Sequence, residues 1–241
     1  MKNEGSNFNY YFESLEDYKH GCLFNDMTHV WEVMKKLQEY VEDTININFF
    51  SEDFKEMKNR QNVVITGKCM IEESTVIYPN VVIEGPSIIG ENCTIMPGAF
   101  IRPYTIIGDN CTIGHCAQVK HSIIMDNAKV QSFTFVGDSI IGDSARVGSG
   151  SILANRRFDQ RNITVKNADE LFDLGLDFFG CVLGDHSRIG ANCTTLPGTF
   201  IGKYTWIGPM TKVKGFIAKE KMLEMKDREM VVYDKARVRL K

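Results

Sequence analysis

Long apolar runs are absent from this sequence of 241 residues. The longest hold three or four residues, as at residues 63–65, whereas a helix needs roughly 20 apolar residues to span a bilayer. The first residues also lack the basic region and the apolar stretch of a secretory signal. We therefore expect a chain that contacts no membrane and stays in the cytoplasm.

An excess of charge of either sign is also missing. Lysine and arginine together number 28 against 31 aspartates and glutamates, which gives a formal net charge of −3. Such a chain has no global positive field to attract nucleic acid, so any anion site must be local. The seven cysteines form no CxxC pair, which argues against a disulfide framework or a zinc knuckle, and we expect no metal.

A repeat of six residues dominates what is present. An aliphatic residue stands at every sixth position from Ile65 to Val119 without a miss. The phase then slips by one residue twice, and the period resumes at Leu183 after an interruption. A helix would need apolar spacings of three and four, and a single long strand a spacing of two. Period six instead predicts short strands that are joined by tight bends and stacked in successive coils.

The second inward position of each hexad is small or β-branched, and four of the cysteines fall on it: Cys69, Cys93, Cys111 and Cys193. We interpret these four as core residues rather than nucleophiles. We place Cys22, Cys116 and Cys181 off that position and predict no role for them.

This pattern resembles the hexapeptide repeat of the left-handed parallel β-helix, a triangular prism with three hexads per coil. The resemblance implies an all-β fold over residues 61–215, with an inserted loop at 156–180. The handedness comes from the resemblance alone, because parallel crossovers are generally right-handed. A long insertion of this kind is commonly functional or an oligomer contact.

The flanking segments have different patterns. Within an N-terminal segment of residues 1–60, residues 28–40 carry apolar side chains at helical spacing. They predict a small amphipathic helix, which we place as a cap over the open end of the prism, where strand edges would otherwise be exposed. The C-terminal tail, residues 216–241, alternates at Val231, Tyr233, Ala236 and Val238, which predicts one or two short strands.

Six short stretches carry a narrower resemblance and lie along about half of the chain: GAFIRP (98–103), QVKH (118–121), TFVGD (134–138), GSGSILAN (148–155), LGDH (183–186) and LPGT (196–199). The first four are similar to the acetyltransferase domain of bifunctional glucosamine-1-phosphate N-acetyltransferase/UDP-N-acetylglucosamine pyrophosphorylase. The last two resemble archaeal sugar-phosphate nucleotidylyltransferases. The resemblance implies a homotrimer that transfers an acetyl group from acetyl-CoA to the amine of a sugar phosphate, at sites between subunits.

The resemblance also implies a set of site residues. Arg102, Lys120 and Arg161 stand at the family's phosphate-binding and sugar-binding cations, and Asn155 at a sugar-contacting asparagine. Ala191 and Pro209 stand where the family contacts coenzyme A with a serine and an alanine.

Three positions of the sugar-phosphate site depart from the family. Ser132 replaces the catalytic histidine, Phe135 a substrate-binding tyrosine and Arg146 an asparagine. A serine cannot act as the base unaided, because its pKa is far above neutrality. His121, beside Lys120, is the substitute base if catalysis is retained, while a solvated surface histidine is the other interpretation.

Three functions therefore remain open. The first is an acyltransferase-like protein that binds or acetylates a sugar phosphate or nucleotide sugar, and the second is a non-catalytic trimeric sugar-nucleotide-binding protein or scaffold. The third is a zinc protein like the γ-carbonic anhydrases, which the spacing disfavours: His115 and His121 are six residues apart, and that family's close pair is five apart. The N-terminal region shows no glycine-rich nucleotide loop, so we expect no nucleotidylyltransferase domain.

Overall fold

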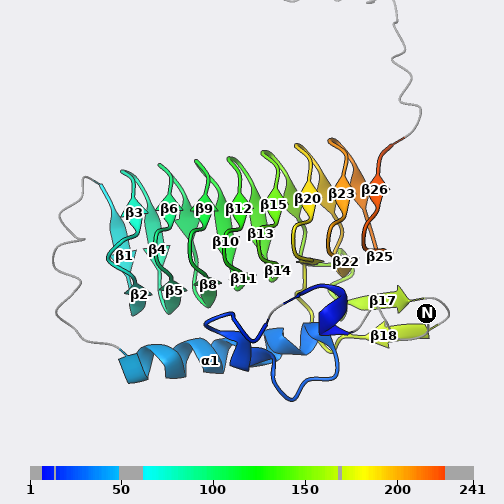
Figure 1. The fold of residues 1–241 in the computed structure, drawn as a ribbon, viewed down its shortest axis with the longest axis horizontal. Helices are drawn as coiled ribbons and strands as arrows, with labels where there is room; N and C mark the ends of the chain where they lie inside the picture. Colours follow the sequence, from blue (N-terminus) through cyan, green and yellow to red (C-terminus); the bar gives the residue numbers. More distant parts are fainter. Residues whose placement is uncertain (1–6, 14, 49–61, 168–169, 226–241) are drawn as a thin grey trace, which may run out of the picture.

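Three parallel sheets wind into a solenoid along the long axis of the molecule (Figure 1). The computed structural model describes residues 7–13, 15–48, 62–167 and 170–225. Each sheet has eight strands, and successive strands along the chain fall on successive sheets. Each strand pairs with its equivalent one coil away, in register and parallel, as Ile83 does with Ile101. The predicted all-β parallel β-helix is confirmed.

The strands are short because the chain turns a corner after each one. Sheet A contains β1 (Val64–Thr66), β4 (Val82–Glu84), β7 (Phe100–Ile101), β10 (Gln118–Lys120), β13 (Phe135–Gly137), β16 (Ile152–Leu153), β21 (Thr194–Thr195) and β24 (Lys212–Val213). Sheet B contains β2 (Cys69–Ile71), β5 (Ser87–Ile89), β8 (Thr105–Ile107), β11 (Ile123–Ile124), β14 (Ile140–Ile141), β19 (Cys181–Leu183), β22 (Thr199–Ile201) and β25 (Phe216–Ile217). Sheet C contains β3 (Val76–Ile77), β6 (Thr94–Ile95), β9 (Thr112–Ile113), β12 (Lys129–Val130), β15 (Arg146–Val147), β20 (Arg188–Ile189), β23 (Trp206–Ile207) and β26 (Met222–Leu223).

The core of the prism is a continuous apolar column. The period-six aliphatic residues and the small residues between them point inward from all three sheets. They are buried except near the two ends of the solenoid, where Ile65, Ile71, Ile217 and Leu223 are partly buried. The four cysteines assigned to the small position are buried, as predicted. Cys181 was placed off that position wrongly: it is fully buried beside Leu183, because the interruption of the repeat had hidden its phase.

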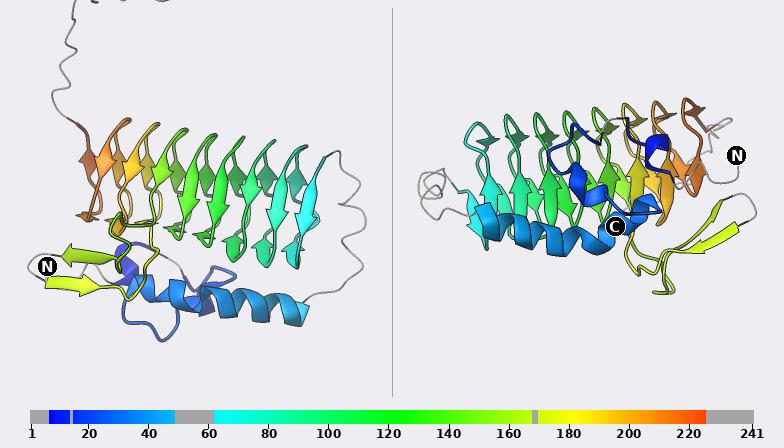
Figure 2. Two further views of the ribbon diagram at one scale, coloured as in Figure 1. Left: turned by 180° about the vertical axis from the view of Figure 1, so that it is seen from behind. Right: turned by 60° about the horizontal axis from the view of Figure 1, so that its bottom comes forward.

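Sheet B is apolar on its outer face as well. Its outward residues are buried beneath the N-terminal segment: Ile88, Ile106, Ile123, Ile140, Val182 and Phe200. The covering elements are η2 (Phe8–Tyr10), η3 (Gly21–Phe24), η4 (Val30–Glu32) and α1 (Val33–Asn48). The helix α1 runs beside the solenoid, along its length, and contacts β2 and β5 (Figures 1 and 2).

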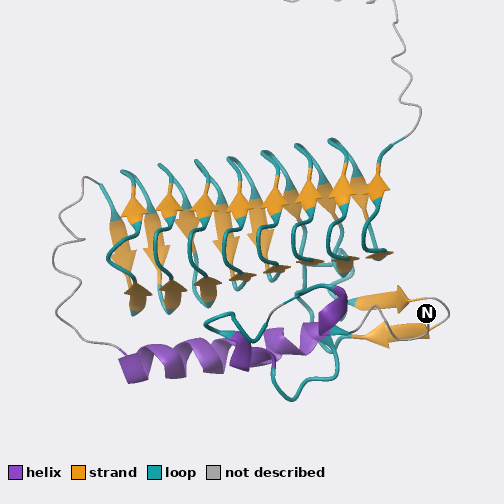
Figure 3. Ribbon diagram, viewed as in Figure 1, coloured by secondary structure: helices purple, strands orange, loops and turns teal. Residues whose placement is uncertain are grey.

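The predicted helix therefore exists, but its position was wrong. It begins at Val33 and continues to Asn48, and it covers a side of the prism rather than an end. The physical reason is that the outer face of sheet B is apolar along the solenoid, and burial of apolar surface stabilises in proportion to its area. The described helical residues all lie on this side (Figure 3). None of the described helices is long and apolar enough to cross a membrane.

The insertion leaves the stack of coils unbroken. It contains an antiparallel hairpin, β17 (Thr164–Asn167) and β18 (Glu170–Asp173), while β16 still pairs with β21. Its Phe172 ring lies 5.7 Å from that of Trp31, so the insertion packs against the N-terminal segment. The solenoid also continues past residue 215 through β25 and β26. The predicted strands around Val231 and Val238 lie outside the described residues.

The buried outer face of sheet B gives a test of the packing. Ile106 points outward from β8 and is fully buried beneath the N-terminal segment. Ile106→Ala should therefore lower the free energy of unfolding by about 3 kcal/mol, because burial energy is lost and a cavity is left behind. Val76, at the matching outward position of sheet C, is 47% exposed, and Val76→Ala should cost less than about 1 kcal/mol. Urea unfolding of both variants measures the difference, and equal losses would contradict the packing of sheet B.

Candidate functional site

The corner between sheets A and B brings together polar residues from successive coils. Lys120 is the last residue of β10 and His121 follows it, while Asp138 follows β13 one coil later. The backbone amide of Asp138 donates to the carbonyl oxygen of Lys120 at 3.0 Å, which fixes one turn above the other. His121 and Asp138 both take a left-handed backbone conformation, with φ of 44° and 47°. Their side chains consequently meet at the corner.

The Asp138 carboxylate is the centre of this cluster. Its side chain is only 6% exposed. One oxygen, Oδ1, lies 2.9 Å from Nδ1 of His121, and Oδ2 lies 3.5 Å from Nζ of Lys120. The side-chain amide of Asn155 also donates to Oδ2. A carboxylate is costly to bury unless it is paired, and these three partners offset that cost.

The Asp138 contact also fixes the tautomer of His121. An ionised carboxylate only accepts hydrogen bonds, so Nδ1 of His121 carries the proton. The other ring nitrogen, Nε2, has no hydrogen-bond partner among the described residues. The ring is held edge-on to Tyr104, with centroids 6.2 Å apart. A histidine oriented in this way by a carboxylate can act as a general base.

The insertion closes one side of the cluster. The Phe178 ring lies against two cations, 4.7 Å from Nζ of Lys120 and 4.8 Å from the guanidinium carbon of Arg156. Between the insertion and the corner lies a hollow of about 360 Å³, which Arg102, Lys120 and His121 line. Cations of this kind bind phosphate or carboxylate groups.

Gly137 makes the close packing at this corner possible. A Cβ atom added to it would lie 2.7 Å from the Asn155 amide nitrogen and 2.7 Å from the Phe135 ring. Any larger residue would therefore push Asn155 away from Asp138. The same contacts place the Phe135 ring, which is half-buried on the outer face of sheet A, beside the cluster.

The structure thus brings Arg102, Lys120, His121 and Asn155 to one corner, with Phe135 beside them. We call these four residues, together with Asp138 and Phe178, the corner cluster. The remaining predicted site residues lie elsewhere in the chain.

Ser132, Ala191 and Pro209 lie in turns of the corner between sheets C and A. Arg146 is exposed on the outer face of sheet C. Arg161 lies in the insertion before β17, where it lines a different hollow with Arg157. A single chain therefore does not assemble these five residues with the corner cluster.

Asp138 and Phe178 are members of the cluster that the sequence reasoning missed. Asp138 stands in the TFVGD stretch, 17 residues after His121, which is the length of one coil at that point of the repeat. That spacing was a usable signal, because residues one coil apart stack. Phe178 offered no comparable signal, since the insertion does not follow the repeat.

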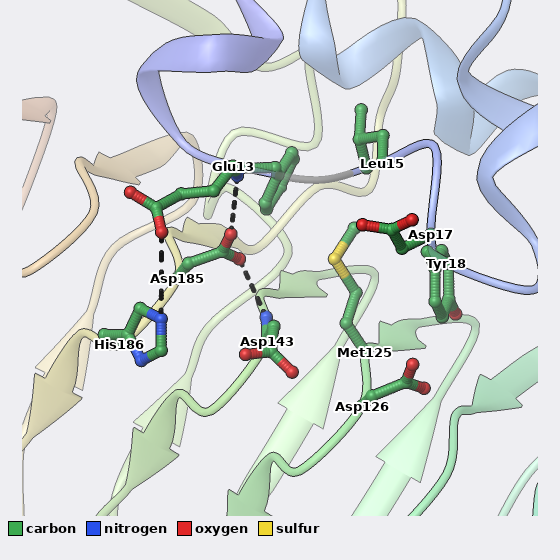
Figure 4. Close-up of a pocket in the computed structure, with 10 residues that line it drawn as sticks. Glu13, Leu15, Asp17, Tyr18, Met125, Asp126, Asp143, Asp185 and His186 are labelled. Atoms are coloured by element: carbon green, nitrogen blue, oxygen red, sulfur yellow. Dashed lines mark hydrogen bonds and ion pairs between the residues drawn. The ribbon is translucent and has the colours of Figure 1, made fainter.

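A second hollow, of about 270 Å³, lies at the corner between sheets B and C, where acidic side chains surround it (Figure 4). Asp185 ties the N-terminal segment to the solenoid there, because its carboxylate accepts from the backbone amides of Glu13 at 2.7 Å and Asp143 at 2.8 Å. Burial raises the pKa of Asp185 to about 6. We assign this carboxylate a structural role. No group of three His, Cys, Asp or Glu side chains in the described part of the chain is placed to hold a metal ion.

Comparison with known proteins agrees with the repeat. A family model described as the GMPPB C-terminal domain matches residues 83–185, and one described as the hexapeptide repeat of succinyl-transferase matches residues 181–204. The chain is a hexapeptide-repeat protein.

Curated relatives cover much of this hexapeptide-repeat protein. It is 38% identical over 148 residues to a bifunctional sugar-1-phosphate nucleotidylyltransferase/acetyltransferase of Sulfurisphaera tokodaii. The aligned region covers 61% of this chain and 37% of the relative. It is 36% identical over 200 residues to the bifunctional protein GlmU of Methanocaldococcus jannaschii, covering 81% of this chain and 46% of the relative. The hexapeptide-repeat protein thus spans less than half the length of these relatives.

Among solved structures, a putative acetyltransferase of Bacillus cereus matches with a TM-score of 0.38 and 20% identity, over 67% of this chain and 74% of that chain.

The paired carboxylate of the hexapeptide-repeat protein can be tested by removing its charge. Asp138→Asn leaves Lys120 and His121 without their anion, and we expect the free energy of unfolding to fall by about 3 kcal/mol. Asp177 lines the same hollow but is exposed, so Asp177→Asn is the matched control and should change stability by less than about 0.5 kcal/mol. Urea unfolding distinguishes the two. A similar small change in both variants would show that Asp138 does not hold the cluster together.

Proposed function

We propose that this protein transfers an acetyl group from acetyl-CoA to the amine of a sugar phosphate or nucleotide sugar, in the chemistry of the UDP-N-acetylglucosamine pathway. The observation that carries the proposal is the His121–Asp138 pair beside Lys120 and Arg102 in one hollow. The printed names of the relatives support it, since one is a nucleotidylyltransferase and acetyltransferase of sugar 1-phosphates.

Acyl transfer to an amine needs a base, and His121 supplies one in the proposal. The acceptor nitrogen attacks the thioester carbonyl carbon, so that a C–N bond forms and the C–S bond breaks. Nε2 of His121 takes the proton that the amine loses and returns it to the departing sulfur. Asp138 holds the ring and stabilises the imidazolium that forms. Ser132, the residue at the family's histidine position, is not the base in this proposal.

Two cations bind the acceptor in the proposal. Lys120 and Arg102 line the hollow together with His121, where a phosphate would bring its negative charge. Asn155 is half-buried and its side-chain amide donates to Asp138. In the proposal it contacts the acceptor and also holds the Asp138 carboxylate in position.

A homotrimer is part of the same proposal. The outer face of sheet A, next to the cluster, presents apolar side chains in several coils, among them Val64 at 49% exposure and Ile152 at 40%. A second copy that covers this face would bring residues of its own to the hollow. Ser132, Arg146, Arg161, Ala191 and Pro209, which one chain does not gather at the corner, are the candidates for that contribution, with Ala191 and Pro209 toward coenzyme A.

Two histidine variants, one at the proposed base and one as a control, test the role of His121. His121→Gln should lower kcat for thiol release from acetyl-CoA by about a hundredfold or more, because the proton acceptor is gone, while the affinity for acetyl-CoA stays unchanged. His186 is a partly exposed histidine at another corner, and His186→Gln should keep the wild-type rate. Kinetics with amino sugar phosphates that carry a free amine as acceptors, beside calorimetric titration, give both quantities.

A full rate in His121→Gln would remove the proposed base. If the wild-type protein binds UDP-N-acetylglucosamine but shows no calorimetric binding of acetyl-CoA, acyl transfer is wrong and the non-catalytic binding protein replaces it. If neither binds, the scaffold interpretation replaces both.

The phosphate contact is tested at Lys120. Lys120→Ala should weaken binding of the sugar phosphate by about 1–3 kcal/mol, since a charged hydrogen bond is lost. The control is Lys212→Ala, which removes an exposed cation from the outer face of the same sheet, away from the hollow. Calorimetry of both variants at one salt concentration measures the effect. Unchanged affinity in Lys120→Ala would take this residue out of the site.

A further inference from the structure

The outer face of sheet C carries three cations in direct register. Lys129 of β12 is the Cα partner of Arg146 on β15, and Arg146 is the partner of Arg188 on β20. Neighbouring strands lie about 4.8 Å apart, so the three side chains leave the sheet one above another. All three are exposed. We call Lys129, Arg146 and Arg188 the cation ladder.

The cation ladder has no counter-charge in the described part of the chain. None of its three residues makes an ion pair there. Asp126, Asp143 and Asp185 each precede a ladder residue by three positions, but their carboxylates face other partners. Asp126 accepts from the backbone of Asp109, Asp185 from that of Asp143, and Asp143 from the Asn127 side chain.

Like charges directly opposite each other on adjacent strands destabilise a sheet. Three consecutive cations are therefore an arrangement that folding alone disfavours and that a bound anion would relieve. The ladder lines a hollow of about 390 Å³ together with polar residues of the neighbouring turns, including Asn127 and Ser144. Two of its cations are arginines, whose planar guanidinium groups bind phosphate through paired hydrogen bonds.

The next position beyond the ladder is aromatic. Trp206 on β23 is the Cα partner of Arg188, and the Arg188 guanidinium carbon lies 5.4 Å from the centre of the Trp206 ring. Trp206 is 50% exposed, although tryptophan side chains are on average well buried. An exposed tryptophan held by an arginine offers a flat surface on which a nucleobase can stack.

We propose that the cation ladder and Trp206 form a binding site for a nucleoside diphosphate, with the phosphates on the ladder and the base against Trp206. From Lys129 to Trp206 the site extends over three strand spacings, about 14 Å, which leaves room for a diphosphate, a ribose and a base in line along the solenoid axis. The nucleoside diphosphate could be part of coenzyme A or of a nucleotide sugar. The site lies on a different face from the corner cluster and does not depend on the proposed acyl transfer.

Calorimetric titration of the 241-residue protein with ADP, UDP, inorganic pyrophosphate and adenosine tests the site. We expect at least one nucleoside diphosphate to bind saturably, and its affinity to fall as NaCl is raised. Arg146→Gln and Arg188→Gln should each weaken that binding about tenfold or more, since each removes a charged contact. Lys212→Gln, an exposed cation on sheet A, is the matched control and should change the affinity by less than twofold.

Trp206→Leu separates the base from the phosphates. It should weaken the nucleoside diphosphate severalfold and leave pyrophosphate unchanged. Tighter binding of ADP than of UDP would assign the site to an adenine nucleotide such as coenzyme A, and the reverse would assign it to a uridine nucleotide sugar.

The proposal is overturned if neither nucleoside diphosphate binds, or if either arginine variant binds as tightly as the wild type. Equal binding of pyrophosphate and nucleotides, unchanged by Trp206→Leu, would overturn the stacking of the base. Melting curves of the variants, which replace exposed residues only, check that each is folded. Loss of nucleotide binding in Arg188→Gln with an unchanged affinity for sugar phosphate separates this site from the corner cluster.

Discussion

The stacking of equivalent residues one strand spacing apart governs this molecule. Each strand pairs in register with its equivalent in the next coil. The neighbours of a side chain along the solenoid are therefore the side chains at the equivalent position of the coil before and the coil after. In the core this places aliphatic residues on aliphatic residues and small residues on small ones. At the corners and on the outer faces it does the same for charge. The Asp138 cluster and the cation ladder both result from this constraint.

The three outer faces of the prism differ in their side chains and in what covers them. Sheet B is apolar on both sides, and the N-terminal segment with α1 covers it. Sheet A presents a mixed apolar face, and sheet C a basic one. The corner cluster lies where the covered sheet meets the partly apolar one, and the insertion adds Phe178 from outside the repeat. The protein thus keeps a rigid scaffold and varies its chemistry through outward residues and one insertion.

The position of the base in the proposed reaction follows from the same geometry. A serine at the family's histidine position lies in a turn between sheets C and A, with no carboxylate partner described there. His121 lies at another corner and is oriented by a buried carboxylate, which supplies what a base needs: a fixed tautomer and a partner for the positive charge. The Asn155 amide also donates to that carboxylate, so Asn155 helps to hold the partner of His121 in place.

The sequence by itself determined the parallel β-helix, because a hydrophobic period of six residues is incompatible with a helix or with one long strand. It also determined the inward cysteines at 69, 93, 111 and 193, and it singled out Arg102, Lys120, His121 and Asn155, which do meet at one corner. The doublets Ile106-Ile107, Ile123-Ile124 and Ile140-Ile141 further marked a sheet that is buried on both faces, a signal that the prediction of an end cap overlooked. Only the tertiary structure decided where α1 packs, that Asp138 binds His121, and that Arg146 belongs with Lys129 and Arg188 rather than with Lys120. The physical reason is that the repeat fixes each residue's position within its own coil, whereas the neighbours of an outward side chain depend on the phase slips and on the insertion, which the period alone does not locate in space.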